Sequence, residues 1–180
     1  MKKRDVAPGM TGEVDEVDEI IAAWRRERGD VDLAPLAVFS RLLRLSKHLD
    51  RVRSKAFAAH GLEQWEFEML SLLRRAGAPY QLPPSKVMAE LMVPSGTLTH
   101  RINCMVERGY AMRAGDESDR RVKYVRATPE GIARVDAAMT DLLDLEKKMI
   151  AHMPPAERTE LARLLKALLG PFEASRATPA

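Results

Sequence analysis

Apolar residues recur at helical spacing through almost the whole chain, and this periodicity limits the fold more than any other feature of the sequence. Separate amphipathic stripes run through residues 14–26, 35–60, 62–76 and 128–150, and a leucine-rich segment follows at 161–170. Aromatic residues make up only 5% of the chain, which suits helices better than sheets. The sequence therefore predicts a mainly helical protein whose helices each bury one face.

The expected helices have recognisable ends. Gly61 and Gly77 follow the second and third stripes, where a glycine commonly ends a helix. Thr128, followed by a proline, is expected to cap a long C-terminal helix. We expect Gly170 to close the last helix and residues 171–180 to fray.

The composition excludes several classes of protein. No apolar run approaches the roughly 18 residues that span a bilayer, and the N-terminus lacks the apolar segment of a secretion signal, so we expect a cytoplasmic protein. The single cysteine, Cys104, excludes an internal disulfide, and the four histidines are too scattered to suggest a metal site. No catalytic set of residues is visible, so we expect neither an enzyme nor a cofactor.

Charge is distributed unevenly along the chain. Residues 11–20 carry five acids and no base, whereas residues 41–75 carry eight Lys or Arg against four acids. The net charge of +3 and a pI of about 9.1 favour anionic partners. A solvated charged face would explain the same distribution if it were the only signal.

A short helical pattern from Ser95 has two contrasting faces. Ser95 is expected to accept a backbone N–H as the N-cap. The stripe expected to be buried consists of Leu98, Ile102, Met105 and Val106. The opposite face consists of Gly96, Thr97, His100, Asn103 and Cys104. Small and hydrogen-bonding side chains on an exposed helix suit close approach to base edges and phosphates, so this helix is a candidate DNA-reading element.

Two strand-like segments follow this helix directly. "YAMRAG" and "RVKYVRA" are joined by the turn-rich "DESD", which predicts a hairpin. Its tip carries Arg120 and Arg121 beside Asp119, and such arginines can enter the minor groove or clamp phosphates while the carboxylate holds a guanidinium in place. A solvated hairpin is the alternative. With a short helix expected around residues 85–92, the order helix, turn, helix, hairpin predicts a winged helix-turn-helix.

From about Ala34 to Leu169 the chain resembles the MarR family of transcriptional regulators. The motifs "PSGTLTHRI", "ERGYAMR" and "DESDRRVKYVRATPEG" are similar to that family's recognition helix, first wing strand and wing. The resemblance implies a mainly α fold with a small β-wing, assembled as a homodimer on a pseudo-palindromic operator. It also implies repression until a small anionic ligand releases the DNA. The residues expected to contact DNA are Ser95, Gly96, Thr97, Thr99, His100, Asn103, Asp119, Arg120 and Arg121.

The additional N-terminal helix resembles the urate-responsive branch of the family and its relatives that respond to aconitate-like carboxylates. The resemblance implies a ligand site formed by Trp24, Glu68, Arg75, Arg101 and Arg113. Glu68 and Arg75 lie two turns apart on one helix, so they can line one cleft, and three arginines favour an anion. Glu68 is a departure, because the branch usually has Asp there and the longer side chain leaves less room for urate. Trp24 as a hydrophobic anchor, and the arginines as salt-bridge partners of nearby acids, are the alternatives.

The pattern divides the chain by function. We expect an N-terminal arm with its extra helix at 1–33, dimerisation helices at 34–62 and 128–170, a winged helix-turn-helix at 63–127, and a tail at 171–180. The terminal helices have more apolar face than a monomer of this size easily covers, which favours a homodimer, and a monomeric helical bundle is the alternative.

A MarR-type regulator with no small-molecule ligand is an alternative, and two other functions stay open. Oxidation of Cys104, which lies on the outer face of the recognition helix, would make the protein a redox-sensing regulator, although an incidental small residue explains the same position. A protein-only interaction module would use the same helices without binding DNA.

Overall fold

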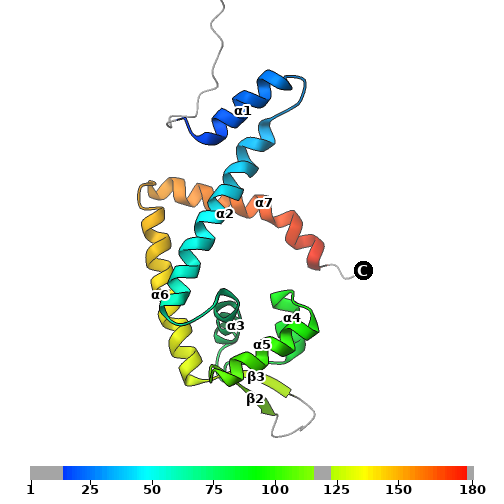
Figure 1. Ribbon diagram of the computed structural model, residues 1–180, viewed down its shortest axis with the longest axis vertical. Coiled ribbons are helices and arrows are strands. Elements are labelled where there is room, and N and C mark those ends of the chain that lie inside the picture. The colour runs from blue at the N-terminus through cyan, green and yellow to red at the C-terminus, as the bar shows by residue number, and fades with distance from the viewer. Residues whose placement is uncertain (1–13, 116–122, 178–180) are drawn as a thin grey trace, which may run out of the picture. The chain divides into compact units, whose positions relative to one another are not determined.

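A computed structural model describes residues 14–115 and 123–177 of the 180-residue chain. The chain divides into two compact units, residues 1–51 and 52–180, and each is described by itself below. Figure 1 labels the helices and the strands β2 and β3.

The first unit contains α1 (Glu16–Glu27) and the first part of α2 (Ala34–Ala59). The Asp15 carboxylate caps α1 by accepting hydrogen bonds from the backbone N–H groups of Val17 and Asp18 at 2.9 and 3.0 Å. Val17 is buried at 1% exposure and anchors the helix. The helix predicted from residue 14 is therefore confirmed.

Ion pairs connect α1 to α2 within this unit. Arg41 donates to the carboxylates of Asp15 and Asp18 at 2.8 and 2.7 Å, and Arg44 donates to Glu16 at 2.5 Å. The hydrogen bond from Arg41 lowers the pKa of Asp15 from 3.8 to about 2. The acidic N-terminal segment thus pairs with the first two bases of the basic region that follows it.

The second unit contains three helices and a small sheet, followed by two long helices. Its elements are α3 (Gln64–Arg75), β1 (Gln81–Leu82), α4 (Pro84–Leu91), α5 (Ser95–Glu107), β2 (Ala111–Gly115), β3 (Lys123–Ala127), α6 (Pro129–Met149) and α7 (Pro155–Ala177). The antiparallel sheet has the order β1-β3-β2. Helix α3 packs against α4, α6 and the sheet. The predicted mainly α fold with a β-wing and a winged helix-turn-helix is confirmed.

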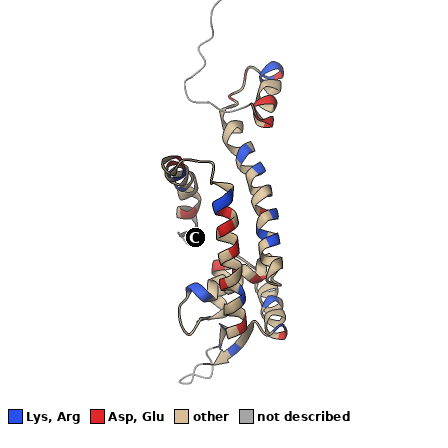
Figure 2. Cartoon of the chain, turned by 90° about the vertical axis from the view of Figure 1, so that its left-hand side faces the viewer, with Lys and Arg blue, Asp and Glu red and all other residues tan. Residues whose placement is uncertain are grey.

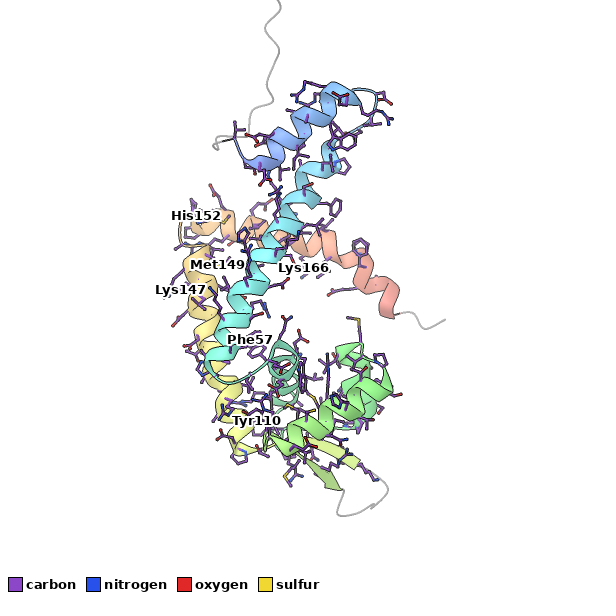
Figure 3. The ribbon with its side chains drawn as sticks, in the orientation of Figure 1. Phe57, Tyr110, Lys147, Met149, His152 and Lys166 are labelled. Carbon is purple, nitrogen blue, oxygen red and sulfur yellow. The ribbon has the colours of Figure 1, made fainter. Side chains whose placement is uncertain are left out.

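The core of this unit forms where the end of α2 meets α3. Phe57 stacks on Phe67 with ring centroids 4.0 Å apart, and both rings are buried. Figure 3 labels Phe57 at the end of α2 and Tyr110 beside the start of β2. This packing fixes one side of α3, and α3 in turn supports α4 and the sheet.

Glycines end α2 and α3 as predicted. Gly61 has φ of +67°, and the N–H groups of Gly61 and Leu62 donate to the carbonyls of Ala58 and Phe57, both at 3.0 Å. This left-handed turn closes α2 and returns the chain into α3. Gly77 follows α3 with φ of +79°. Thr128 caps α6 by accepting the N–H of Gly131 at 3.1 Å, which also confirms the prediction.

The predicted end of the last helix is wrong. Helix α7 continues through Gly170 and Pro171 to Ala177, so the expected fraying does not begin at residue 171. Pro171 lacks an N–H, which leaves the carbonyl of Ala167 without its helical donor. Ala167 is exposed, so water can satisfy that carbonyl and the helix need not stop. The two-residue strand β1 was not predicted, because so short a segment carries no periodic signal.

None of the helices in the described part of the chain is long and apolar enough to cross a membrane.

Candidate nucleic-acid interface

Helix α5 is anchored in the core by one face. Leu98, Ile102 and Met105 are at most 3% exposed, as the sequence predicted. Val106 was predicted to be buried with them but is 38% exposed. At about 100° per residue it lies about 80° from Leu98, at the edge of the stripe, so it faces away from the core.

The start of α5 also differs from the prediction. Pro94 occupies the N-cap position, and Ser95 is the first helical residue rather than the cap. The carbonyl of Pro94 accepts the N–H of Leu98 at 2.9 Å, so the first helical bond already forms from residue 94. Pro94 provides the extended backbone that an N-cap requires, with ψ of 152°, and it has no side-chain oxygen to offer the helix.

The outward face of α5 is small and polar. Gly96, Thr97, Thr99, His100 and Asn103 are all exposed. A Cβ at Gly96 would meet nothing within 4 Å, so the backbone there is open to a close approach. The Thr99 hydroxyl donates to the carbonyl of Ser95 at 3.0 Å. Half-buried Cys104 places its Sγ 3.6 Å from Nε2 of His100.

One residue of the wing contacts this face. Nη2 of Arg113, on β2, donates to Oδ1 of Asn103 at 2.6 Å. Strand β2 pairs with β3 in register from Ala111–Ala127 to Gly115–Lys123. The predicted tip residues Asp119, Arg120 and Arg121 lie outside the described residues.

A buried ion pair, which the sequence analysis missed, holds the end of α5. The carboxylate of Glu66 is fully buried and accepts two hydrogen bonds of 2.7 Å from Nη1 of Arg108, whose side chain is 39% exposed. Arg108 also donates to the carbonyl of Gly61 at 2.7 Å and to the Tyr110 hydroxyl at 3.2 Å. Burial alone would lower the pKa of Arg108, but Glu66 and Tyr110 outweigh it and raise the pKa.

This ion pair positions the interface without belonging to it. It joins the first turn of α3, the turn after α2 and the residue that ends α5, so the orientation of α5 depends on it. The only local sequence signal is the two acids, Glu66 and Glu68, inside the apolar run "WEFEMLSLL". A buried acid requires a partner, but the sequence does not say which of the two acids is buried or which base pairs with it.

Four of the predicted ligand residues belong to the second unit. Glu68 and Arg75 are exposed on α3, where Glu68 accepts from Gln64 at 3.0 Å. The guanidinium carbon of Arg101 lies 5.4 Å from the ring centroid of Trp65. Within the described residues, Arg75, Arg101 and Arg113 form no ion pair with an acid.

The fifth predicted ligand residue, Trp24, belongs to α1 in the first unit and is 51% exposed. Arg113 also lines a cavity of about 320 Å³ between α4, α5 and β2. The other lining residues are Pro84, Ser85, Met88, Ser95, Leu98, Thr99 and Ile102.

Comparison with known proteins decides the family. The regulator PecS of Dickeya dadantii, described as an HTH-type transcriptional regulator, is 35% identical over 150 residues, which cover 83% of this chain and 90% of PecS. The transcriptional repressor YetL of Bacillus subtilis is 27% identical over 69% of this chain and 80% of its own length. The chain belongs to the MarR family of transcriptional regulators. No family model matches it.

Solved structures of MarR proteins share the fold. A mutant of MarR from E. coli in complex with operator DNA aligns with a TM-score of 0.62 at 23% identity, over 77% of this chain and 99% of that one. Sco5413 from Streptomyces coelicolor, a MarR family regulator, aligns with the same TM-score at 22% identity, over 80% and 96% of the two chains. The relatives are transcriptional regulators, which confirms the prediction that this MarR-family chain is not an enzyme.

Proposed function

We propose that the protein is a homodimeric repressor that reads operator DNA with the outward face of α5. The observation that carries the proposal is the contrast between the two faces of this helix. One face is locked in the core, and the outward positions Gly96, Thr97, His100 and Asn103 expose small or hydrogen-bonding groups. Such a face admits the helix into the major groove and offers donors and acceptors to base edges.

We assign base contacts and backbone contacts to different residues according to the chemistry of their side chains. Thr97, His100 and Asn103 read bases, and Ser95, Gly96 and Thr99 lie at the start of the helix, where small residues and a helix N-terminus suit phosphate contact. In the wing, Asp119, Arg120 and Arg121 contact the flanking backbone and minor groove. A dimer would place two copies of α5 about one DNA turn apart, on half-sites whose centres are about 10 base pairs apart.

Exposed apolar side chains on the long helices support a homodimer. In α7, four leucines and a phenylalanine are 39% to 63% exposed: Leu161, Leu164, Leu165, Leu169 and Phe172. In α2, Val38, Phe39, Leu42 and Leu45 are 38% to 51% exposed. Surfaces of this kind mark protein interfaces, and a second copy of the chain is the partner that family membership supports.

Binding assays with two classes of variant test this assignment. Asn103→Ala and His100→Ala should chiefly reduce the ratio of operator to random-DNA affinity, because they remove base contacts worth about 1 to 3 kcal/mol. Arg121→Ala should weaken both kinds of binding and reduce the salt slope by about one. Thr140→Ala, an exposed change on α6, is the control. If Arg121→Ala left binding unchanged at low salt, the wing assignment would be wrong.

Sedimentation tests the dimer, and a protein that sediments as a monomer at micromolar concentration would contradict it.

We further propose that a small anion, either a purine of the urate type or an aconitate-like carboxylate, releases the DNA. Trp24, Glu68, Arg75, Arg101 and Arg113 are the proposed ligand residues. The absence of acid partners for the three arginines, among the described residues, leaves their charge available to an anion. The hydrogen bond from Arg113 to Asn103 supplies a route to the DNA face, because a ligand that captures Arg113 would remove the contact that orients Asn103.

Ligand titration tests this proposal separately from DNA binding. Arg75→Ala should keep operator binding and lose release by urate, xanthine, citrate or trans-aconitate. Arg113→Ala should also lose release, but it should weaken operator binding as well, because it removes the contact that orients Asn103. A coupling of about 1 to 3 kcal/mol, or about 5- to 150-fold in DNA affinity, is sufficient for a switch. Quenching of Trp24 in a Trp65→Phe background reports binding. If none of the four compounds caused quenching or DNA release, the ligand class would be wrong and the DNA-reading assignment would still stand.

A redox switch at Cys104 is the second candidate. The observation that favours it is the 3.6 Å contact between its sulfur and the imidazole of His100, on the proposed reading face. Peroxide treatment should then weaken operator binding of the wild type and leave Cys104→Ser unaffected. Equal loss in both proteins would exclude this switch.

A further inference from the structure

The first unit contains a cationic cavity that neither the DNA interface nor the proposed ligand group uses. Its volume is about 380 Å³, within the range of small-molecule sites. The residues that line it are Ile20, Ser40, Leu43, Arg44, Lys47, His48 and Arg51. Figure 2 shows blue basic segments recurring along α2, from which six of these seven residues come.

The basic residues of the cavity form one row on α2. Arg44, Lys47, His48 and Arg51 are spaced i, i+3, i+4 and i+7, so they lie on the same face of the helix. Like charges at this spacing destabilise a helix, and an ordinary solvated face alternates them with acids. Asp50 lies three residues after Lys47, about 60° from it around the helix, but it forms no ion pair with the row among the described residues. The row therefore has no ion-pair partner on its own helix.

Helix α1 neutralises only one end of the basic side of α2. Its acids engage Arg41 and Arg44. Lys47, His48 and Arg51 have no acid partner among the described residues, and the only hydrogen bond found for Arg51 is to the carbonyl of Lys47 at 3.3 Å. The side chains of Lys47, His48 and Arg51 are exposed toward solvent. Of the four residues in the row, only Arg44 has a carboxylate partner among the described residues, and Lys47, His48 and Arg51 are open to an added anion.

We propose that this cavity binds a small phosphorylated molecule carrying two or more phosphate groups. Guanidinium and ammonium groups bind phosphate oxygens through charge-assisted hydrogen bonds, and several converging cations match a multiply charged anion better than a single carboxylate. Ile20 and Leu43 at the edge of the cavity offer an apolar contact to an organic portion of the ligand. The lining is confined to seven residues of α1 and α2, an area that suits a small molecule better than duplex DNA, whose contacts spread over a larger surface.

Calorimetric titration of the full-length protein with ATP, at about physiological ionic strength, tests the proposal. ATP should bind saturably. Lys47→Gln/Arg51→Gln should weaken its binding by about tenfold or more, because two charge-assisted contacts to phosphate are lost. The matched control is Lys147→Gln/Lys148→Gln, which removes the same charge from exposed positions on α6; Figure 3 labels Lys147. Absence of saturable binding, or equal weakening by both double variants, would overturn the proposal.

Two further ligands, tripolyphosphate and citrate, show which chemical groups the cavity recognises. Tripolyphosphate that binds as well as ATP would assign recognition to the phosphates alone, whereas weaker tripolyphosphate binding would assign part of it to Ile20 and Leu43. Citrate binding that depends on Lys47 and Arg51 should be at least about tenfold weaker than ATP binding, because carboxylates form fewer contacts with guanidinium groups than a polyphosphate does. If citrate bound as tightly as ATP and lost as much affinity in Lys47→Gln/Arg51→Gln, the phosphate class would be wrong.

Removing the carboxylate partner of Arg44 on α1 should strengthen ATP binding, and this provides a test in the opposite direction. Glu16→Gln releases Arg44 into the cavity and should tighten ATP binding by about threefold, a shift expected for one added weak ion pair. Glu19→Gln removes the same charge from an exposed position of α1 and should change the affinity less. If both variants increased the affinity for ATP equally, the change in net charge alone would explain the effect, and the cavity assignment would be wrong.

Measurement of operator binding distinguishes a small-molecule site from a DNA-contacting surface. Lys47→Gln/Arg51→Gln should bind operator DNA as the wild type does, because the cavity is assigned to a small molecule. If this variant lost DNA affinity in proportion to its loss of ATP affinity, the basic row would be a DNA-contacting surface and the small-molecule proposal would be wrong.

Discussion

The two units use the same chemical pair, an arginine and a carboxylate, in different environments. In the first unit, Arg41 binds Asp15 and Asp18 where all three side chains are 30% to 47% exposed. In the second unit, Arg108 binds Glu66, which is completely buried. Exposed pairs are screened by water and contribute little, whereas a buried carboxylate deprived of its partner is costly. The difference indicates that the α1 contact is adjustable and the support of α5 is not.

The largest expected effect tests this difference directly. Arg108→Met should lower the free energy of unfolding by about 3 to 5 kcal/mol, because it leaves the Glu66 carboxylate buried and unpaired. Arg41→Met, the matched change in the first unit, should cost about 1 kcal/mol or less. Urea unfolding followed by circular dichroism measures both. Equal losses would show that burial does not distinguish the two pairs.

The sequence predicted what depends on local spacing and missed what depends on distant partners. The helices, their glycine ends at Gly61 and Gly77 and the buried stripe of α5 follow from residues within a few positions of each other. Glu66 and Arg108 are 42 positions apart, so no local pattern in the sequence indicates that they pair. The 2.6 Å contact between Asn103 and Arg113 likewise depends on how β2 returns beside α5. The continuation of α7 past Gly170 depends on solvent reaching Ala167 rather than on any residue signal.

Close packing in the second unit gives the next largest effect. A Cβ at Gly131 would lie 2.1 Å from the carbonyl oxygen of Tyr110, so Gly131→Ala forces the start of α6 away from the turn between α5 and β2. We expect a loss of about 2 to 3 kcal/mol in the free energy of unfolding. At Gly170 a Cβ would meet nothing within 4 Å beyond its chain neighbours, and the gain in helix propensity is opposed by crowding against the Pro171 ring, so Gly170→Ala should change the free energy of unfolding by less than about 1 kcal/mol. If thermal unfolding showed equal losses for the two variants, the packing described at Gly131 would be wrong.

The smallest expected effect is the loosening of α1 at low pH. Asp15 has a pKa of about 2 in the folded chain against 3.8 without its partners, because Arg41 hydrogen-bonds its carboxylate. Its stabilising contribution is therefore complete above pH 3.8 and is lost as the pH falls through about 2. Fluorescence of Trp24 in a Trp65→Phe background should change across this range as α1 loosens. Asp15→Asn should remove that part of the acid response. An unchanged acid response would show that the Arg41 pair does not hold α1.

Selection of binding sites from random duplex DNA by the purified protein tests the central claim most directly. If a dimer reads bases with the exposed face of α5, the selected sequences should converge on a pseudo-palindrome whose half-site centres lie about 10 base pairs apart. Asn103→Ala should select a sequence relaxed at symmetric positions in both half-sites. Failure to enrich any sequence, or affinity for the selected DNA no greater than for random DNA, would contradict the assignment of α5 as the reading helix.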